Sequence, residues 1–341
     1  MDSLTQIALG ATVAEAVIGR KVGNRAIMWG AICGTLPDLD VFVPMGGAVE
    51  NFTYHRSYSH SVIVLAALTP LIVWLITKVH PATRPMWRGW TLAVFLALAT
   101  HPILDCFTVY GTQILWPIWP EPVSWSAIFI IDPFYTLPLA TGALCALFMS
   151  RQIGVGHRMA LTGLALSSVY MAWAVTAKSI IAVRLQTALV AQGLEKNLVL
   201  TTPAPFTTLL WRTVVMDGDR YHEGYMSLFD EEPGIKLNAY PTQPDLLMDI
   251  QSHWPVERLK WFTHGFYSVR TASPQIVMSD LRMGVEGSYI FSFQVGRVND
   301  GVSIPVPNKR VPQPQNLSRL GAVWQRIWDQ EVSLAPQQID Q

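Results

Sequence analysis

Residues 89–110 have the sequence GWTLAVFLALATHPILDCFTVY, an apolar stretch long enough to cross a membrane. It contains two side chains suited to metal binding, His101 and Asp105, which stand four residues apart and therefore share one face of a helix. Ionisable groups inside a membrane span are costly in free energy and usually mark a functional site. The segment predicts a membrane-spanning helix that carries a polar site.

Two further polar insertions interrupt apolar sequence upstream. The motif LPDLD at residues 36–40 places Asp38 and Asp40 directly after a proline, which disfavours helix at the residue before it. The motif HRSYSH at residues 55–60 holds two of the eight histidines and one arginine. Carboxylate oxygen and imidazole nitrogen are ligands that divalent metals take together. We expect the three insertions to form one polar site that binds a divalent metal.

Composition separates a membrane half from a water-soluble half. Only 14% of the 341 residues are charged, against about 25% in a typical soluble domain. Residues 1–200 hold 21 of the 48 charged side chains, and residues 201–341 hold 27. The net charge is zero, so nothing indicates a nucleic-acid partner. The three cysteines all lie in apolar segments without metal-finger spacing, which argues against disulfides and thiolate metal sites.

The first half contains six apolar segments that are candidate helices, at residues 4–18, 26–37, 61–77, 89–110, 123–150 and 159–177. The last four approach or reach the length of a membrane span. The first segment is short and contains Glu15, so it lies either at the membrane interface or inside the bundle. Asp132 precedes Pro133 and can either support the ligands of the site or cap a helix, and the cap is favoured.

The second half has the alternating pattern of strands. Residues 207–216 and 220–229 flank Asp217-Gly218-Asp219 and predict a β-hairpin. Further strands are expected at residues 265–270, 275–282 and 288–295, helices at 252–263 and 317–332, and a proline-rich linker at 304–314. The predicted fold is an α-helical integral membrane bundle over residues 1–185, followed by a β-rich α+β extramembrane domain over residues 200–341 that ends in an amphipathic helix.

Basic residues indicate the orientation in the membrane. They cluster in three connections between alternate spans, as Arg20, Lys21 and Arg25, as Lys78, Arg84 and Arg88, and as Arg151 and Arg158. Connections rich in lysine and arginine stay in the cytoplasm. The opposite, extracytoplasmic face then receives the three polar insertions and the second half of the chain. We therefore expect a multi-pass protein of the bacterial inner membrane with its site outside the cytoplasm.

Each polar insertion has a structural alternative. Asp38 and Asp40 can be ligands, or they can cap a helix after the proline turn. One of His55 and His60 can be a ligand and the other an acid/base, while Arg56 can hold an anionic oxygen such as phosphate; otherwise the loop simply faces lipid headgroups. Ser59 is placed to cap the helix that begins near Ser61.

His101 and Asp105 can bind a metal from one rigid helix, or they can form a buried hydrogen bond between helices. The histidine cluster, expected on the same side of the membrane, favours the metal.

Four motifs together resemble one family. They are MDSLTQ at residues 1–6, GTLPDLD at 34–40, HRSYSHS at 55–61 and HPILD at 101–105, and they are similar to bacterial membrane-bound metal-dependent hydrolases of the YdjM-like family. The ligand pattern also resembles that of zinc-dependent phospholipases C. The resemblance covers residues 1–180 and implies that Asp38, His60, His101 and Asp105 bind metal, with His55 a further ligand or the acid/base. Many family members have histidine where this chain has Gln6, a weak ligand.

These features lead to one main hypothesis and two alternatives. The first is a membrane-bound, zinc-dependent hydrolase that uses a metal-activated water on a phosphoester, a membrane lipid or a lipid-linked substrate. The second is a non-catalytic membrane protein with a structural or sensory metal site and a partner-binding soluble domain. The third is an ion or proton pathway, which is disfavoured because residues 61–77 and 159–177 supply only Ser, Thr and Tyr as polar groups.

Overall fold

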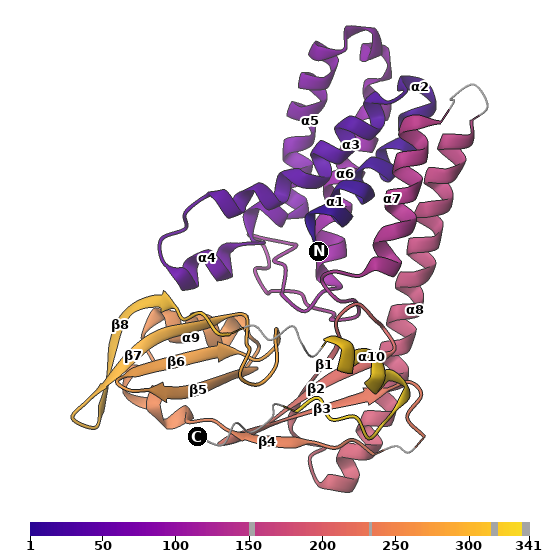
Figure 1. Cartoon of the computed structure of the whole chain (residues 1–341). Coiled ribbons are helices and arrows are strands. Elements are labelled where there is room, and N and C mark those ends of the chain that lie inside the picture. Colours follow the sequence, from indigo (N-terminus) through magenta and orange to yellow (C-terminus); the bar gives the residue numbers. More distant parts are fainter. Residues whose placement is uncertain (150–153, 232–233, 315–319, 336–341) are drawn as a thin grey trace. The chain divides into compact units, whose positions relative to one another are not determined.

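The chain folds into two compact units (Figure 1). The structure is a computed structural model, and it describes residues 1–149, 154–231, 234–314 and 320–335. The first unit comprises Met1–Val43 and His55–Ala174, and the second comprises Pro44–Tyr54 and Val175–Gln341. The segment between the two upstream motifs therefore belongs to the second unit.

Apolar helices build the first unit. They are α1 (Ser3–Ala14), α2 (Arg20–Val22), α3 (Arg25–Thr35), α5 (Val62–Val79), α6 (Trp87–Cys106), α7 (Pro133–Phe148) and the first part of α8 (Val155–Gln192), with a π-helix at Glu15–Gly19 (Figure 1). Three stretches are long and apolar enough to cross a membrane, namely Val62–Val79, Pro81–Cys106 and Val155–Gln192. The predicted helical bundle followed by a β-rich domain is confirmed.

Helix α7 begins later than the sequence pattern predicts. Residues 123–132 are not helical, and Val123 instead pairs with Thr112 in an antiparallel bridge. The helix starts at Pro133 because Asp132 caps it, accepting hydrogen bonds from the backbone N–H groups of Phe134 (3.0 Å) and Tyr135 (3.4 Å). The predicted cap is confirmed, the predicted helical start at residue 123 is wrong, and residue 150 lies outside the described residues.

Helix α8 is twice as long as the span predicted at residues 159–177. Its 38 residues extend for about 57 Å, well beyond the roughly 30 Å of hydrocarbon in a bilayer. From Ala177 onward, buried positions recur every three or four residues through Leu189 and pack against Trp211 and Val215 in the second unit. The helix continues past the apolar stretch because this C-terminal part has a β-sheet to cover.

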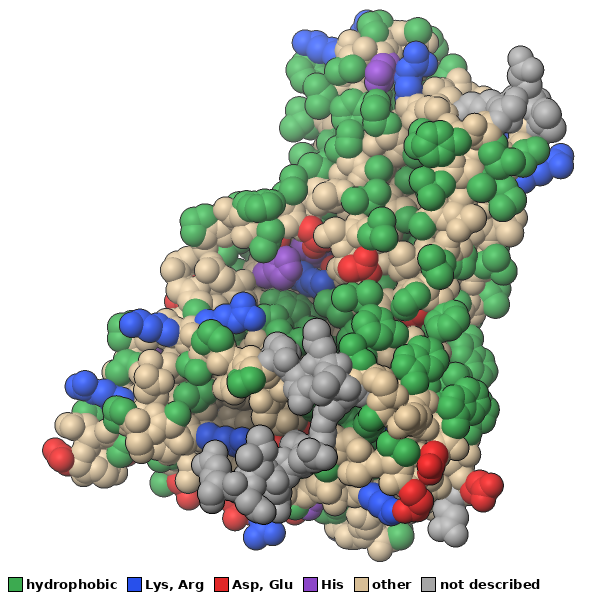
Figure 2. All heavy atoms as spheres, viewed as in Figure 1, with side chains coloured by type: hydrophobic (Ala, Val, Ile, Leu, Met, Phe, Trp, Pro, Cys, Tyr) green, Lys and Arg blue, Asp and Glu red, His purple; other side chains and the backbone are tan. Residues whose placement is uncertain are grey.

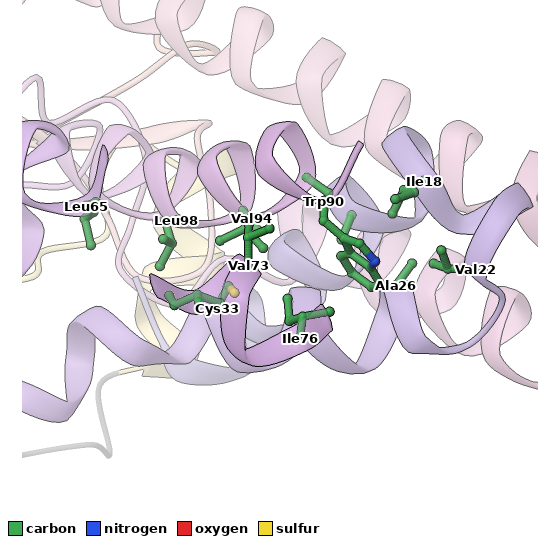
Figure 3. Close-up of a cluster of buried hydrophobic side chains, with 14 residues drawn as sticks. Ile18, Val22, Ala26, Cys33, Leu65, Val73, Ile76, Trp90, Val94 and Leu98 are labelled. Carbon is green, nitrogen blue, oxygen red and sulfur yellow. The ribbon is translucent and has the colours of Figure 1, made fainter. Parts of the chain in front are cut away.

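Large side chains pack between helices in the main core of the first unit. Val73 and Ile76 of α5 lie in one cluster with Trp90, Val94 and Leu98 of α6 (Figure 3). The indole N–H of Trp90 donates to the hydroxyl of Thr83 at 3.1 Å, so this fully buried ring leaves no polar atom unpaired. Glu15 is also buried, and its carboxylate lies 3.4 Å from His157; the first helical segment therefore packs inside the bundle.

Glycines bring α1 and α3 unusually close together. A Cβ atom on Gly10 would lie 2.3 Å from the carbonyl oxygen of Gly30, and one on Gly34 would lie 2.3 Å from that of Gln6. Helices in membranes commonly use small residues for such backbone contacts. The contact places the polar side chain of Gln6 next to the end of α3, where the LPDLD motif begins.

The second unit contains two antiparallel four-stranded sheets, each with its strands in sequence order (Figure 1). The first consists of β1 (Leu198–Pro203), β2 (Leu210–Asp217), β3 (Arg220–Ser227) and β4 (Asn238–Pro241), and the second of β5 (Tyr267–Ala272), β6 (Gln275–Asp280), β7 (Ser292–Asn299) and β8 (Val302–Arg310). The helices are α4 (Ala48–Tyr54), α9 (Trp254–Phe262) and α10 (Leu320–Trp328). The predicted hairpin is confirmed, with Gly218 at a φ of 63° in its turn.

Two predictions for the second unit need correction. The predicted linker at residues 304–314 is wrong, because residues up to Arg310 belong to β8. Pro305 and Pro307 are compatible with this strand because it lies at the edge of its sheet, where a missing N–H is tolerated. The predicted helix at 317–332 is described from Leu320 and ends at Trp328; residues 317–319 lie outside the described residues.

Segment Pro44–Tyr54 is built into the core of the second unit. The Phe52 ring lies 4.9 Å from that of Phe262 and 4.4 Å from that of Phe291, measured between ring centroids. The backbone N–H of Val49 donates to the side-chain oxygen of Asn308 at 2.9 Å. The polypeptide that joins LPDLD to HRSYSH is thus held by residues more than 200 positions away.

Candidate metal centre

Three elements of the first unit position the site. Helix α6 carries His101 and Asp105 one turn apart on the same face. Helix α3 ends before Pro37, and a 3₁₀ helix at Leu36–Phe42 then carries Asp38. A second 3₁₀ helix at Tyr58–His60 presents His60. Figure 2 shows histidine, acidic and basic side chains gathered in one small area, with mostly apolar side chains on the helices above it.

Four ligand atoms from Asp38, His60, His101 and Asp105 converge on one point. The two Nε2 atoms of His60 and His101 are 3.2 Å apart, and each lies 3.4 Å from Asp38 Oδ1. Asp105 Oδ2 lies 3.4 Å from His60 Nε2 and 3.5 Å from His101 Nε2. Ligands of a tetrahedral metal at about 2.0–2.1 Å are about 3.3–3.4 Å from one another. The spacing therefore fits a metal of that kind.

Hydrogen bonds fix which nitrogen of each histidine carries its proton. His101 Nδ1 lies 2.6 Å from the carbonyl oxygen of Gly34, which can only accept, so Nδ1 is the donor. His60 Nδ1 lies 2.9 Å from the hydroxyl of Ser59, and that hydroxyl donates its own proton to Asp40 at 2.5 Å. A neutral ring held in this way directs an Nε2 lone pair at the common point, as metal-ligating histidines do.

The centre of the cluster favours positive charge. His60, His101 and Asp105 are fully buried, and Asp105 Oδ2 accepts no hydrogen bond from the described residues. Burial by itself would lower the pKa of His60, but the carboxylates of Asp105 and Asp38 beside its Nε2 outweigh burial and raise it. Burial would raise the pKa of Asp38, but the imidazoles of His101 and His60 beside it lower it. Four acceptors that face one another fit a divalent cation.

The amide nitrogen of Gln6 orients Asp105. Its Nε2 donates to Asp105 Oδ1 at 3.1 Å and to the carbonyl oxygen of His101 at 3.3 Å. The α-amino group of Met1 also donates to Asp105 Oδ1. Sequence reasoning missed both contacts, because they join residues about 100 positions apart.

Asp40 and His55 form a pair next to the cluster. The Asp40 carboxylate accepts from His55 Nδ1 at 2.8 Å and from the Ser59 hydroxyl, and its Oδ2 lies 3.8 Å from His60 Nδ1. Burial would raise the pKa of Asp40, but the hydrogen bond and charge of His55 lower it. Asp40 thus lies behind His60, and the side chain of His55 remains 24% exposed.

The expected helix cap at Ser59 is wrong. Helix α5 is capped by Ser61, whose hydroxyl accepts from the backbone N–H of Val64 at 3.5 Å. The Ser59 hydroxyl is instead committed to Asp40 and His60. Its position in the 3₁₀ helix turns it toward these side chains and away from the first turn of α5.

Arg56 lies directly against the cluster. Its Nε is 3.3 Å from Asp105 Oδ2, and its Nη1 donates to the hydroxyl of Thr108 at 3.2 Å. The guanidinium also lies over the ring of Tyr110, at 4.8 Å from the centroid. Its backbone φ of 63° is strained for a side chain of this size, and such strain clusters at functional sites. Thr108 was missed, although its position three residues after Asp105, just beyond the end of α6, could have indicated it.

Comparisons with known proteins found one family and one relative. A family model described as YdjM inner membrane protein matches residues 1–181, slightly more than half of the chain. The chain is also similar to an uncharacterized protein, YfhP, of Bacillus subtilis (strain 168), with 27% identity over 143 residues. That similarity covers 39% of this chain and 42% of the relative, so the chain spans less than half of that protein. No solved structure matches the chain.

Proposed function

The chain belongs to the YdjM inner membrane protein family, and on this premise we propose that it is a membrane-bound, metal-dependent hydrolase. The proposed ligands are Asp38, His60, His101 and Asp105. The observation that carries the proposal is that one ligand atom from each of these four residues lies within 4.8 Å of the others, while both histidine Nδ1 atoms bond to other partners. Zinc is the proposed metal, because it combines imidazole and carboxylate ligands in tetrahedral geometry.

The residues around the cluster support hydrolysis of a phosphoester. A metal bound here would lower the pKa of a water molecule and polarise a phosphoryl oxygen. Asp40 holds Nδ1 of His55, which leaves Nε2 on the exposed side to accept or donate a proton as general base or acid. Arg56 supplies the positive charge that would neutralise an anionic oxygen of the substrate. Membrane-integral helices support a lipid or lipid-linked substrate.

One observation favours a different function. Four protein ligands are enough to close a tetrahedral metal site, and closed sites are typically structural. The alternative is a non-catalytic membrane protein whose metal is structural or sensory and whose β-rich domain binds a partner. The side chain of Asp38 is 20% exposed. Access to the site next to this proposed ligand distinguishes the two functions, because a catalytic site must admit water or substrate there.

Substitution of His55 separates the two functions. We expect His55→Ala to reduce hydrolysis of a chromogenic aryl phosphodiester, or of phosphatidylglycerol in vesicles, by about 100-fold or more while zinc content stays unchanged. The matched control is His222→Ala, which removes another His–Asp pair, the one with Asp217 in the second unit. Wild-type turnover in the His55 variant would contradict the proposed acid/base role. Bound zinc without hydrolysis of either compound by the unsubstituted protein would favour the structural alternative.

The proposed orientation places the site and the second unit outside the cytoplasm. Lys and Arg side chains gather at the top of the helical unit in Figure 2, which supports a cytoplasmic location for that end. The labelling sites are introduced one at a time into a protein that carries Cys145→Ala. Pro120→Cys and Gly218→Cys should react with an impermeant thiol reagent in intact cells, whereas Pro85→Cys should not. All three positions are exposed, and the remaining cysteines are buried. Labelling at Pro85→Cys alone would show that the orientation is the reverse of the proposed one.

A further inference from the structure

A groove lies between helices of the first unit, apart from the metal cluster. Its volume is about 420 Å³, and it is lined by residues of α1, the π-helix, α6, α7 and α8. The lining is apolar except for Thr100, Tyr135 and Ser168. Ile103 belongs to the lining and is 41% exposed, so the groove is continuous with the lipid-facing surface of the bundle. Because hydrocarbon surrounds that surface in a membrane, hydrocarbon is what fills such a groove.

The hydroxyl of Tyr135 gives the groove one available donor. Thr100 and Ser168 donate to carbonyl oxygens of their own helices, at 2.7 Å to Leu96 and 2.8 Å to Leu164. The Tyr135 side chain is 94% buried, and its hydroxyl makes no hydrogen bond with the described residues. A phenol in an apolar environment is costly without an acceptor. An acceptor carried by the occupant of the groove would satisfy it.

The length of the groove matches one leaflet of a bilayer. Its lining runs along α6 from Leu96 and ends at Phe107, the C-cap of this helix, a rise of about 16 Å, and the hydrocarbon core of a bilayer is about 30 Å thick. Tyr135 lies in the first turn of α7 and packs in one cluster with Leu104, so the donor is at the same end as Phe107. The opposite end, at Val17, is apolar.

We propose that this groove binds one acyl chain of an ester-linked phospholipid, with the Tyr135 hydroxyl donating to the ester carbonyl oxygen. The chain then extends from Tyr135 toward Val17 and Leu96. The headgroup lies at the end of α6 that carries Asp105, since Leu104 lines the groove and precedes Asp105. Binding of this lipid does not require the proposed hydrolysis.

Photolabelling of the full chain in phosphatidylcholine vesicles tests the groove. The vesicles contain a phospholipid with a photoactivatable diazirine on its acyl chain, and labelled residues are mapped by mass spectrometry. We expect labels at Leu96, Leu164 and Met171, and a loss of at least about fivefold in Ser168→Trp, which fills the groove. The matched control, Ser179→Trp, changes an exposed serine of α8 with the same kind of bond to its own helix, and labelling should be unchanged.

Equal labelling in Ser168→Trp, or labels spread evenly to Leu71 on α5, would overturn the proposal in favour of ordinary surrounding lipid.

A second variant tests the donor without filling the groove. The unsubstituted protein should prefer an ester-linked over an ether-linked competitor by about fivefold, and Tyr135→Phe should lose this preference. No preference in the unsubstituted protein would overturn the role of Tyr135. Zinc content should be unchanged in both variants, which separates this test from that of the metal site.

Discussion

Asp105→Ala is expected to lower the affinity for zinc by more than about 100-fold and to abolish hydrolysis. Loss of groups that only orient ligands lowers metal affinity about 10- to 100-fold, and Asp105 is itself one of the four proposed ligands. Membrane insertion should be unaffected, because the variant removes a charge from an apolar helix. Zinc is measured in detergent-purified protein by competition with a chelator of known affinity.

Two further variants make this result interpretable. Asp105→Asn keeps the size of the side chain and limits rearrangement of Arg56, and it should also lose zinc. Asp132→Ala removes a different buried aspartate, which caps α7 and does not belong to the cluster, and it should retain zinc. Full zinc content in both Asp105 variants would exclude Asp105 as a ligand.

Gly30→Leu should have the largest effect on stability. A Cβ at this position would lie 2.3 Å from the carbonyl oxygen of Gly10 and 2.6 Å from the Cβ of Ala14, so α1 and α3 would have to separate. Overpacking of this kind typically costs 1–3 kcal/mol, and we expect a loss of at least about 3 kcal/mol here because backbone is involved. Thermal unfolding monitored by circular dichroism measures the change.

Zinc binding should fall with stability in this variant, because α1 carries Gln6 and α3 carries the carbonyl group of Gly34 that orients His101. Gly321→Ala is the control, since a Cβ there meets no atom within 4 Å and alanine favours helix. Unchanged unfolding in Gly30→Leu would contradict the close packing of α1 on α3.

The helical segments and the three polar insertions could be predicted because they contrast with their surroundings. In an apolar chain, His101 and Asp105 are conspicuous, and their spacing fixes a shared helix face. The bounds of α7 were harder, because residues 123–132 are nearly as apolar as the helix itself. There the chemistry of Asp132 and Pro133, not hydropathy, determines the first residue of the helix.

The residues of the LPDLD motif alone could not rank Asp38 against Asp40, although the family resemblance implied only Asp38 as a ligand. Both follow Pro37, and both were expected to bind metal. In a 3₁₀ helix with three residues per turn, the side chains of residues two apart are rotated by about 240° about the helix axis. Asp38 and Asp40 thus point in different directions. Asp38 therefore reaches His60 Nε2 and His101 Nε2, while Asp40 reaches His55 and Ser59.

Contacts between distant segments were also beyond prediction. Nothing local indicates that Phe52 packs against Phe262 and Phe291, so the place of segment Pro44–Tyr54 in the second unit follows only from the fold. The same holds for Gln6 and Asp105, which meet because α1 packs beside α6 in the fold. Strand β8 was missed because prolines suggest a linker unless the strand is known to be at an edge.

The most direct test of the metal site is anomalous scattering at the zinc edge from crystals of the zinc-saturated protein. The expected result is a single strong peak enclosed by Asp38 Oδ1, His60 Nε2, His101 Nε2 and Asp105 Oδ2, at about 2.0–2.1 Å from each atom that binds it. A folded protein with no peak among these four residues, or with its strongest peak elsewhere, such as between His222 and Asp217, would contradict it.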